Sequence, residues 1–245
     1  MKLSSLAKAL LASSMLFTAA HATAAEPITV TGSAAFTTDY LFRGISQTGN
    51  NAAVQAGMTA THESGAYFSV WGSSVGFTDS GSTDGLDGGL EIDALLGFSG
   101  KAGEVAYDVG VMHYGYPSAD AALGYDEIYA SVSTMGAKVG LNYSNDYFAK
   151  SDKFMYLYAS YGTEVAGVGL SASLGMNKFD SAAMMSNALG TTGTDDSYMD
   201  YKLAASKAIG GMTIEGAYIG SDIDDTECGG GLCEGRFVLT ASKSF

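Results

Sequence analysis

The sequence has little proline, cysteine, histidine or positive charge. Its 245 residues include 2 prolines, 2 cysteines and 3 histidines, and its 12 lysines and arginines face 26 acidic residues, giving a net charge of −14. This acidic balance excludes a nucleic-acid-binding protein. No histidine lies near the two cysteines in the sequence, which favours a disulfide between them over a metal site. We predict no metal and no cofactor.

Long apolar runs are also missing beyond the amino terminus. Lys2 and Lys8 flank the start of an apolar run at 9–20, and Ala22-Thr23-Ala24 follows it. This order predicts a secretory signal peptide over residues 1–24, because the run is too short for a membrane anchor helix. Cleavage would leave 10 basic and 26 acidic residues, a net charge of −16, in a mature chain of residues 25–245. With no later run of about 20 apolar residues, a membrane protein of this sequence would have to be a β-barrel.

The last eleven residues, Gly235 to Phe245, show the pattern that fills most of the chain. Phe237, Leu239 and Ala241 alternate with polar or smaller residues up to the terminal Phe245, and period two is typical of a β-strand with two different faces. A free edge there would invite aggregation unless another strand covered it. The first strand is the simplest partner, and pairing with it would close a barrel.

Similar alternation, bounded by Gly, Asn, Asp and Ser clusters, predicts twelve strands. Long polar loops follow strands 1, 3, 5, 7, 9 and 11, and short turns follow the others. Loops sorted in this way are typical of an antiparallel up-and-down transmembrane β-barrel. The fold class is therefore all-β, with strands at about 28–42, 52–62, 66–75, 89–99, 104–116, 125–134, 137–143, 153–161, 167–177, 197–208, 212–220 and 235–245.

The two faces of these strands predict which side meets lipid. In 89–99, Leu90, Ile92, Ala94 and Leu96 form the apolar face, which we expect to lie against lipid. The opposite face of the strands is rich in Gly, Ser, Thr and charge, and this composition is not that of a packed core. The small inward residues leave room for a wet interior, although loops that fold inward could fill it. The residues predicted to line the pore are Glu91, Asp93, Asp108, Asp200 and Lys202.

The two cysteines lie in Cys228-Gly-Gly-Gly-Leu-Cys233. An exported chain meets an oxidising compartment, and three glycines let the intervening segment bend tightly. We predict a disulfide between them in the last external loop.

Residues 38–48 read Thr-Asp-Tyr-Leu-Phe-Arg-Gly-Ile-Ser-Gln-Thr, and Trp71-Gly72 and an aromatic carboxyl terminus follow. In these features the chain resembles the TorF-type porin family, a Gcw_chp-type family of outer-membrane proteins. The resemblance implies a porin in the bacterial outer membrane, reached through the periplasm and assembled there by machinery that recognises Phe245. It places the motif residues Asp39, Tyr40, Arg43 and Gly44 near the pore mouth. We favour a structural ion pair or an interfacial anchor for Asp39 and Arg43 over a direct role in the pore.

Three functions stay open at this point. The first is a passive channel for small hydrophilic solutes, with a cation preference if the inward acids are ionised. The second is a barrel enzyme such as a hydrolase. His21 leaves with the signal, His62 lies beside a short turn, and His113 is the remaining candidate base, near Asp126 and Glu127 in register. The third is a structural or adhesive barrel with a plugged lumen, since twelve strands enclose a modest pore. No catalytic residue is assigned.

Overall fold

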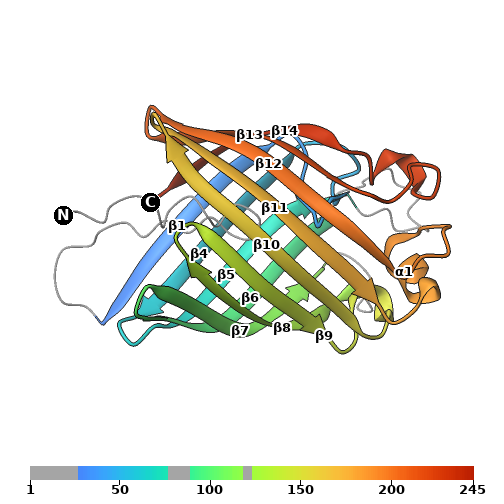
Figure 1. Ribbon diagram of the computed structural model, residues 1–245, viewed down its shortest axis with the longest axis horizontal. Helices are drawn as coiled ribbons and strands as arrows, with labels where there is room; N and C mark the ends of the chain where they lie inside the picture. The colour runs from blue at the N-terminus through green and yellow to red at the C-terminus, as the bar shows by residue number, and fades with distance from the viewer. Residues whose placement is uncertain (1–26, 77–88, 118–122) are drawn as a thin grey trace.

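The computed structural model describes residues 27–76, 89–117 and 123–245. In these ranges the chain forms a closed antiparallel barrel of twelve strands, each paired with its neighbours in the sequence (Figure 1). The predicted fold class and strand number are confirmed. The barrel strands are β1 (Ile28–Thr37), β4 (Ala53–His62), β5 (Ala66–Val75), β6 (Gly89–Ala102), β7 (Val105–Gly115), β8 (Tyr125–Thr134), β9 (Ala137–Ser144), β10 (Phe154–Val165), β11 (Val168–Phe179), β12 (Ser197–Ile209), β13 (Met212–Ser221) and β14 (Arg236–Ser244).

The first and last strands close the barrel. Ser33 to Thr37 of β1 pair with Thr240 to Ser244 of β14. Beyond the end of β14, the backbone of Phe245 exchanges two hydrogen bonds with Gly32, at 2.8 and 3.0 Å, and its ring lies against that glycine. The sheet is left without a free edge.

The two faces of each strand differ as the alternation predicts. On β6, Leu90, Ile92 and Leu96 are 42%, 41% and 59% exposed, while Glu91 and Asp93 are each 2% exposed. An exposed apolar surface of this extent marks a membrane-facing protein. Every barrel strand contributes at least one large exposed apolar side chain, such as Ile28, Val54, Phe68, Leu96, Val109, Ile128, Val139, Leu157, Leu174, Leu203, Met212 and Leu239.

The connections are sorted between the two ends of the barrel. The end with the short connections, between β4 and β5, β6 and β7, β8 and β9, β10 and β11, and β12 and β13, is called the turn end here; the opposite end is the loop end. The predicted turn at 162–166 is wrong in its bounds, because β10 continues to Val165 and the turn is Ala166-Gly167, where both residues have positive φ. The loop end also carries a helix, α1 (Ala182–Leu189), within a segment predicted to be loop. Ser181 caps its first turn by accepting a hydrogen bond from the Met184 amide.

Two 3-10 turns, η3 (Phe148–Lys150) and η4 (Gly229–Gly231), lie in other connections at the loop end. In the part of the chain that the structure describes, no helix is long and apolar enough to cross a membrane. The predicted signal peptide, residues 1–24, lies outside the described residues.

The prediction of a single strand over 28–42 is wrong at its end. β1 stops at Thr37, and the chain then forms a separate small hairpin of β2 (Leu41–Phe42) and β3 (Ile45–Ser46). Arg43 and Gly44 connect the two strands with φ angles of 51° and 81°. Two successive positive φ angles are typical of a tight two-residue hairpin turn. We call residues 38–51 the inward hairpin, because it folds into the barrel.

The interior is not wet throughout, because loop residues fill part of it, as the small inward residues leave room for. At the loop end the lumen contains a packed aromatic cluster, in which the rings of Tyr114 and Tyr125 stack with centroids 4.3 Å apart and those of Tyr147 and Phe154 stack at 4.0 Å. Rings in this geometry add to the free energy of burial. The cluster is built from inward residues near the ends of strands together with loop residues, and also includes Tyr116, Phe179, Met185, Tyr198 and Ile223.

Candidate functional site

The lumen of the barrel is the candidate site, and an ion pair lies within its loop-end half. Arg43, at the tip of the inward hairpin, donates two hydrogen bonds to the Glu127 carboxylate of β8, at 2.8 and 2.9 Å. The two side chains are 5% and 0% exposed. The guanidinium also lies over the rings of Phe154 and Tyr156, 4.8 and 4.4 Å from their centroids. A bidentate pair with aromatic neighbours fixes the hairpin tip in one position.

The hairpin contacts strands on several sides of the lumen. The Tyr40 ring packs edge-on against Trp71 of β5, with centroids 5.5 Å apart, and its hydroxyl donates to Glu91 of β6 at 3.3 Å. At the tip, Gly44 lies so close to Gly220 of β13 that a Cβ atom there would clash with the Gly220 carbonyl. Gly44 therefore serves both the turn and this close approach. Together with the Arg43–Glu127 pair, these contacts make the hairpin a partition across the loop-end half of the lumen.

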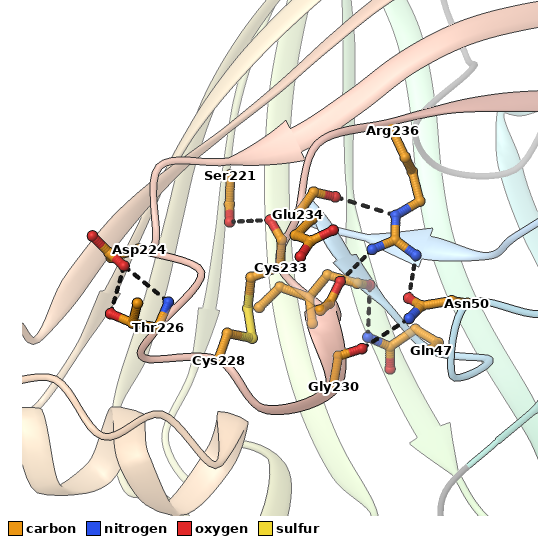
Figure 2. Close-up of a disulfide and its surroundings, with 12 residues drawn as sticks. Gln47, Asn50, Ser221, Asp224, Thr226, Cys228, Gly230, Cys233, Glu234 and Arg236 are labelled. Atoms are coloured by element: carbon orange, nitrogen blue, oxygen red, sulfur yellow. Dashed lines mark hydrogen bonds between the residues drawn. A yellow bond between two sulfur atoms is a disulfide. The ribbon is translucent and has the colours of Figure 1, made fainter.

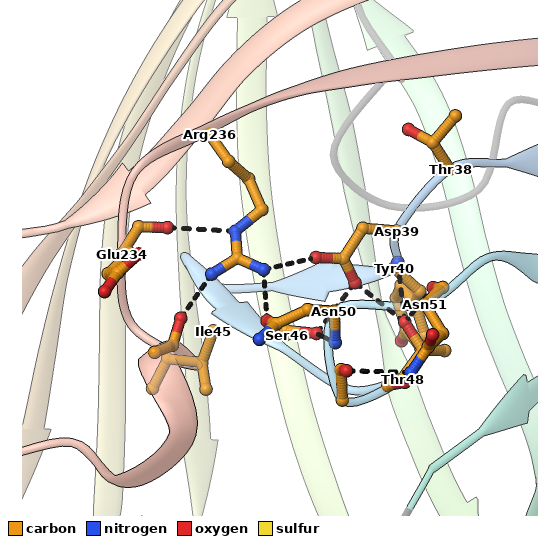
Figure 3. A network of polar contacts seen from close by, with 12 residues as sticks. Thr38, Asp39, Tyr40, Ile45, Ser46, Thr48, Asn50, Asn51, Glu234 and Arg236 are labelled. Carbon is orange, nitrogen blue, oxygen red and sulfur yellow. Dashed lines mark hydrogen bonds and ion pairs between the residues drawn. The ribbon is translucent and has the colours of Figure 1, made fainter.

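A second ion pair holds the base of the hairpin. Arg236, the first residue of β14, donates to Asp39 at 3.0 Å and also to Asn50 (Figure 3). The other Asp39 oxygen accepts from Ser46 and Thr48, both at 2.7 Å. Asp39 and Arg43 thus pair with other chain segments rather than with each other. Of the two structural roles expected for Asp39 and Arg43, both residues form ion pairs, and Arg43 is buried inside the barrel rather than at a membrane interface.

The loop between β13 and β14 lies against the inward hairpin. The structure joins Cys228 and Cys233 by a disulfide in this loop (Figure 2). The Leu232 carbonyl accepts from the Ser46 amide at 2.9 Å, and the Gly230 carbonyl accepts from the Asn50 side chain at 2.9 Å. The bridged loop therefore presents its backbone carbonyls to the hairpin.

Two carboxylates near the loop end carry pKa shifts that report their local contacts. The Thr226 hydroxyl and amide donate to Asp224 at 2.6 and 2.9 Å and hold the pKa of that carboxyl below its usual value. Lys178, whose ammonium lies 2.6 Å from Asp196, does the same for the pKa of Asp196. Both acids are exposed, and they stay ionised at neutral pH at the end of the barrel that carries the long loops.

The five residues predicted to line the pore all lie on the inner face, but in different surroundings. Glu91 and Asp93 are covered at the level of the hairpin, and one Asp93 oxygen has no hydrogen-bond partner. Asp200 is also buried, where it accepts from Asn177 at 2.8 Å and from Tyr156 at 3.2 Å. Whether these three acids line a conducting path stays a prediction.

The two other residues of that set lie closer to the turn end. Asp108 is half-buried and accepts a hydrogen bond from the Tyr67 hydroxyl at 2.7 Å. Lys202 pairs with Glu215 of β13 at 2.7 Å. In this half several inward residues are small or polar and partly exposed, for example Ser33, Lys138, Ser160, Ser171 and Ser173. The lumen is therefore filled at the loop end and wet toward the turn end.

The partners that complete these pairs are not marked by a local pattern in the sequence. In the sequence, Glu127 stands out only as a neighbour of His113 in register, and Arg236 only as part of the last strand. Glu127 lies on the inner face of β8, whereas His113 and Asp126 lie on the outer face, with 2.7 Å between Nδ1 and Oδ1. Both are exposed, at 59% and 82% of their side chains. An outward base near the rim is poorly placed to serve an active site inside the barrel.

Among the residues that the structure describes, no three His, Cys, Asp or Glu side chains are grouped so that they could hold a metal ion.

Comparisons with known proteins agree with the barrel. A family model described as "Bacterial protein of unknown function (Gcw_chp)" matches residues 21–245. A solved structure described as "KdgM porin" is similar in fold, with a TM-score of 0.53 and 8% identity over 88% of this chain and 99% of that chain. Another, described as "NanC porin structure in rhombohedral crystal form", has a TM-score of 0.50 and 8% identity over 87% and 98% of the two chains. No curated protein matches the sequence.

Proposed function

The chain belongs to the Gcw_chp family of bacterial proteins of unknown function. We propose that it is an outer-membrane channel for small hydrophilic solutes, and that the inward hairpin narrows this channel at the loop end of the barrel. The observation that carries the proposal is the reversal of polarity between the two faces of the sheet. Large apolar side chains are exposed around the outside, and charged and hydroxyl groups face inward. Such a sheet is stable in lipid and leaves a polar path through it.

The porin-like fold supports the outer membrane as the location, with the long loops outside and the short turns toward the periplasm. Export through the periplasm by a cleaved signal at residues 1–24, and assembly by machinery that recognises Phe245, belong to the same proposal. The resemblance of residues 38–48 to TorF-type porins belongs to this proposal as well.

A preference for cations follows from the inward charges. Glu91, Asp93, Asp108 and Asp200 have Lys202 as the clearest inward base predicted from the sequence, and Lys202 is paired with Glu215. Excess carboxylate in a low-dielectric ring enriches cations along the path.

Conductance in planar bilayers tests the channel directly. The purified protein is compared with a variant in which residues 39–50 are replaced by a short Gly-Ser linker. We expect small or brief openings from the wild type and larger, steady steps from the variant, because the hairpin obstructs the loop end. Heat-dependent gel mobility shows that both barrels are folded. Silence from both folded proteins would exclude a channel.

A permanently plugged structural barrel is the second candidate, and the buried Arg43–Glu127 pair favours it. The same experiment separates the two functions. A plugged barrel gives no openings in the wild type and conducts only after the hairpin is replaced. Openings of the wild type, which a plugged barrel would not give, support a channel with a movable hairpin.

A further inference from the structure

Three inward tyrosines lie flat on the barrel wall in the part of the lumen below the hairpin. Tyr67, Tyr129 and Tyr158 each face a glycine on the neighbouring strand in register, namely Gly97, Gly110 and Gly140. A Cβ atom on Gly97 would come within 2.6 Å of the Tyr67 hydroxyl oxygen, and a Cβ on Gly140 would clash with the Tyr158 ring. The rings therefore occupy the space that these glycines leave empty, with one face toward the wall. We call these residues the tyrosine wall.

The register makes part of the wall continuous. Tyr67, Gly97, Gly110 and Tyr129 are successive partners across β5, β6, β7 and β8. The two rings point toward each other over the two glycines, and their hydroxyl groups hydrogen-bond. Tyr158 extends the aromatic surface on β10 and stacks with Tyr156 at a centroid distance of 5.3 Å.

Polar groups of both signs flank the rings. Asp108 accepts from the Tyr67 hydroxyl at 2.7 Å, and the Lys138 ammonium lies 5.6 Å from the centre of the Tyr158 ring. Both side chains are half-buried, as are the three tyrosines. The surface thus combines flat apolar rings with hydroxyl, carboxylate and ammonium groups and has no excess of either charge.

Access to the wall is from the turn end. The hairpin, the Arg43–Glu127 pair and the aromatic cluster fill the lumen on the other side, where Glu91, Glu127 and Asn177 are at most 2% exposed. A solute on the tyrosine wall would rest below this partition. Concave sites with apolar walls and a few placed polar groups are the usual form of a small-molecule site.

We propose that the tyrosine wall is a binding site for neutral saccharides, which deepens the proposed channel function and rests on it for the route of the solute. A pyranose has an apolar C–H face that covers an aromatic ring and a rim of hydroxyls that donate and accept hydrogen bonds. Asp108 accepts from such hydroxyls and Lys138 donates to them. Because Asp108 and Lys138 lie together beside the rings, their charges offset each other for a simple ion, and an uncharged polar ring uses both groups as hydrogen-bond partners.

Calorimetric titration of the purified protein in detergent tests the site without requiring conductance. The titrants are maltotriose, cellobiose and lactose. We expect saturable binding of at least one of them to the wild type and about tenfold weaker binding to Tyr158→Ala, which removes one stacking face. Gly140→Ala should also weaken binding although it keeps the tyrosine, because the new methyl group pushes the ring away from the wall.

Tyr107→Ala is the matched control. Tyr107 lies against Gly100 in the same way but on the outer face of the barrel, next to Phe98. Its loss should leave saccharide affinity unchanged, and heat-dependent gel mobility shows that each variant is folded. Tetraethylene glycol, which has hydroxyl ends but no pyranose face, should not bind.

The outcomes separate this inference from the channel itself. Absence of saturable binding for all three saccharides, unchanged affinity in folded Tyr158→Ala, or tighter binding of the zwitterion glycine betaine would overturn the saccharide site. Conductance without saccharide binding overturns the site alone. Saccharide binding by a folded protein whose wild type and linker variant do not conduct overturns the channel alone.

Discussion

At the scale of single residues, the position of the inward hairpin depends on a buried ion pair. Arg43 and Glu127 satisfy each other with two short hydrogen bonds, and Tyr114 and Asn142 donate to the same carboxylate oxygen, at 3.2 and 2.8 Å. A buried pair adds little net stability over an apolar pair of similar size, but loss of one partner leaves a buried charge without compensation. The pair therefore specifies the position of the hairpin more than it stabilises the barrel.

The substitution Arg43→Met should weaken docking of the hairpin by about 3–5 kcal/mol, because Glu127 then stays buried and unpaired. The barrel itself should stay folded. Limited proteolysis within residues 38–51, followed by mass spectrometry, measures the release of the hairpin. The double variant Arg43→Met with Glu127→Leu removes both charges and should recover much of the protection. Equal protection of the single variant and the wild type would show that the pair does not hold the hairpin.

The disulfide acts on a neighbouring segment. Cys228 and Cys233 close a short loop, and constraining a loop of this length is worth about 2 kcal/mol in the chain-entropy treatment. Since this loop offers the Gly230 and Leu232 carbonyls to the hairpin, we expect Cys228→Ser with Cys233→Ser to speed proteolysis of residues 38–51 and to leave the unfolding temperature of the barrel almost unchanged. A large loss of barrel stability with no change at the hairpin would contradict this assignment.

At the scale of elements, two adjacent residues of β1 test which face of the strand meets lipid and which meets the lumen. Ala34 is exposed on the outer face of β1 near its middle, and Ser33 lies beside it on the inner face. Ala34→Arg should destabilise the folded barrel in lipid vesicles, reducing its free energy of unfolding by about 2–4 kcal/mol, because an arginine on the lipid face near the bilayer midplane costs about this much. Ser33→Arg places the same charge at the same depth in the wet part of the lumen and should fold almost as well as the wild type. Equal folding yields of the two variants would contradict the assigned faces.

The elements themselves were largely predictable from the sequence. Successive side chains of a barrel strand face lipid and the lumen in turn, so a short segment is enough to predict a strand. On β6, Leu90, Ile92 and Leu96 alternate in this way with Glu91 and Asp93. Leu41 and Phe42 continue the apolar character of the first strand in the sequence, but the structure places them in the separate β2–β3 hairpin inside the barrel, beyond the end of β1 at Thr37. The overrun of the first predicted strand has this cause.

The content of the lumen was less predictable. Glu127 and Arg43 are 84 residues apart, and Arg236 and Asp39 are 197 residues apart, so no local pattern pairs them. The aromatic cluster was missed because its tyrosines and phenylalanines lie at the ends of strands, where alternation is interrupted. The abundance of tyrosine, 15 residues against 11 phenylalanines and one tryptophan, was the available signal, since a phenol can face a polar interior as well as a membrane interface.

At the scale of the whole molecule, charge sets the expected selectivity. Cations should carry most of the current through an open lumen, and reversal potentials under a KCl gradient measure this. Asp108→Asn should shift the reversal potential toward zero, because Asp108 is an acid of the inner face that is half-buried in the wet half and, unlike Glu215, forms no ion pair with Lys202. Asp126→Asn makes the same change of charge on the outer face and should have no effect. The linker variant provides a steady current for both measurements.

The preference should also fade as salt rises, because the screening length falls from about 10 Å at 0.1 M to about 3 Å at 1 M. An anion-selective pore, or an unchanged reversal potential in Asp108→Asn, would show that this carboxylate does not face the conducting path.

The closure of the barrel at Phe245 and Gly32 also constrains when the protein can fold. The two strands that complete the ring, β1 and β14, are the first and the last barrel strands along the chain. Hairpins between neighbouring strands are able to form from local segments, but the ring stays open until β14 reaches β1. Until then β1 lacks a neighbour on one side, and its exposed backbone groups invite pairing with other chains. Protection of β1 until β14 has paired with it is therefore a consequence of the topology.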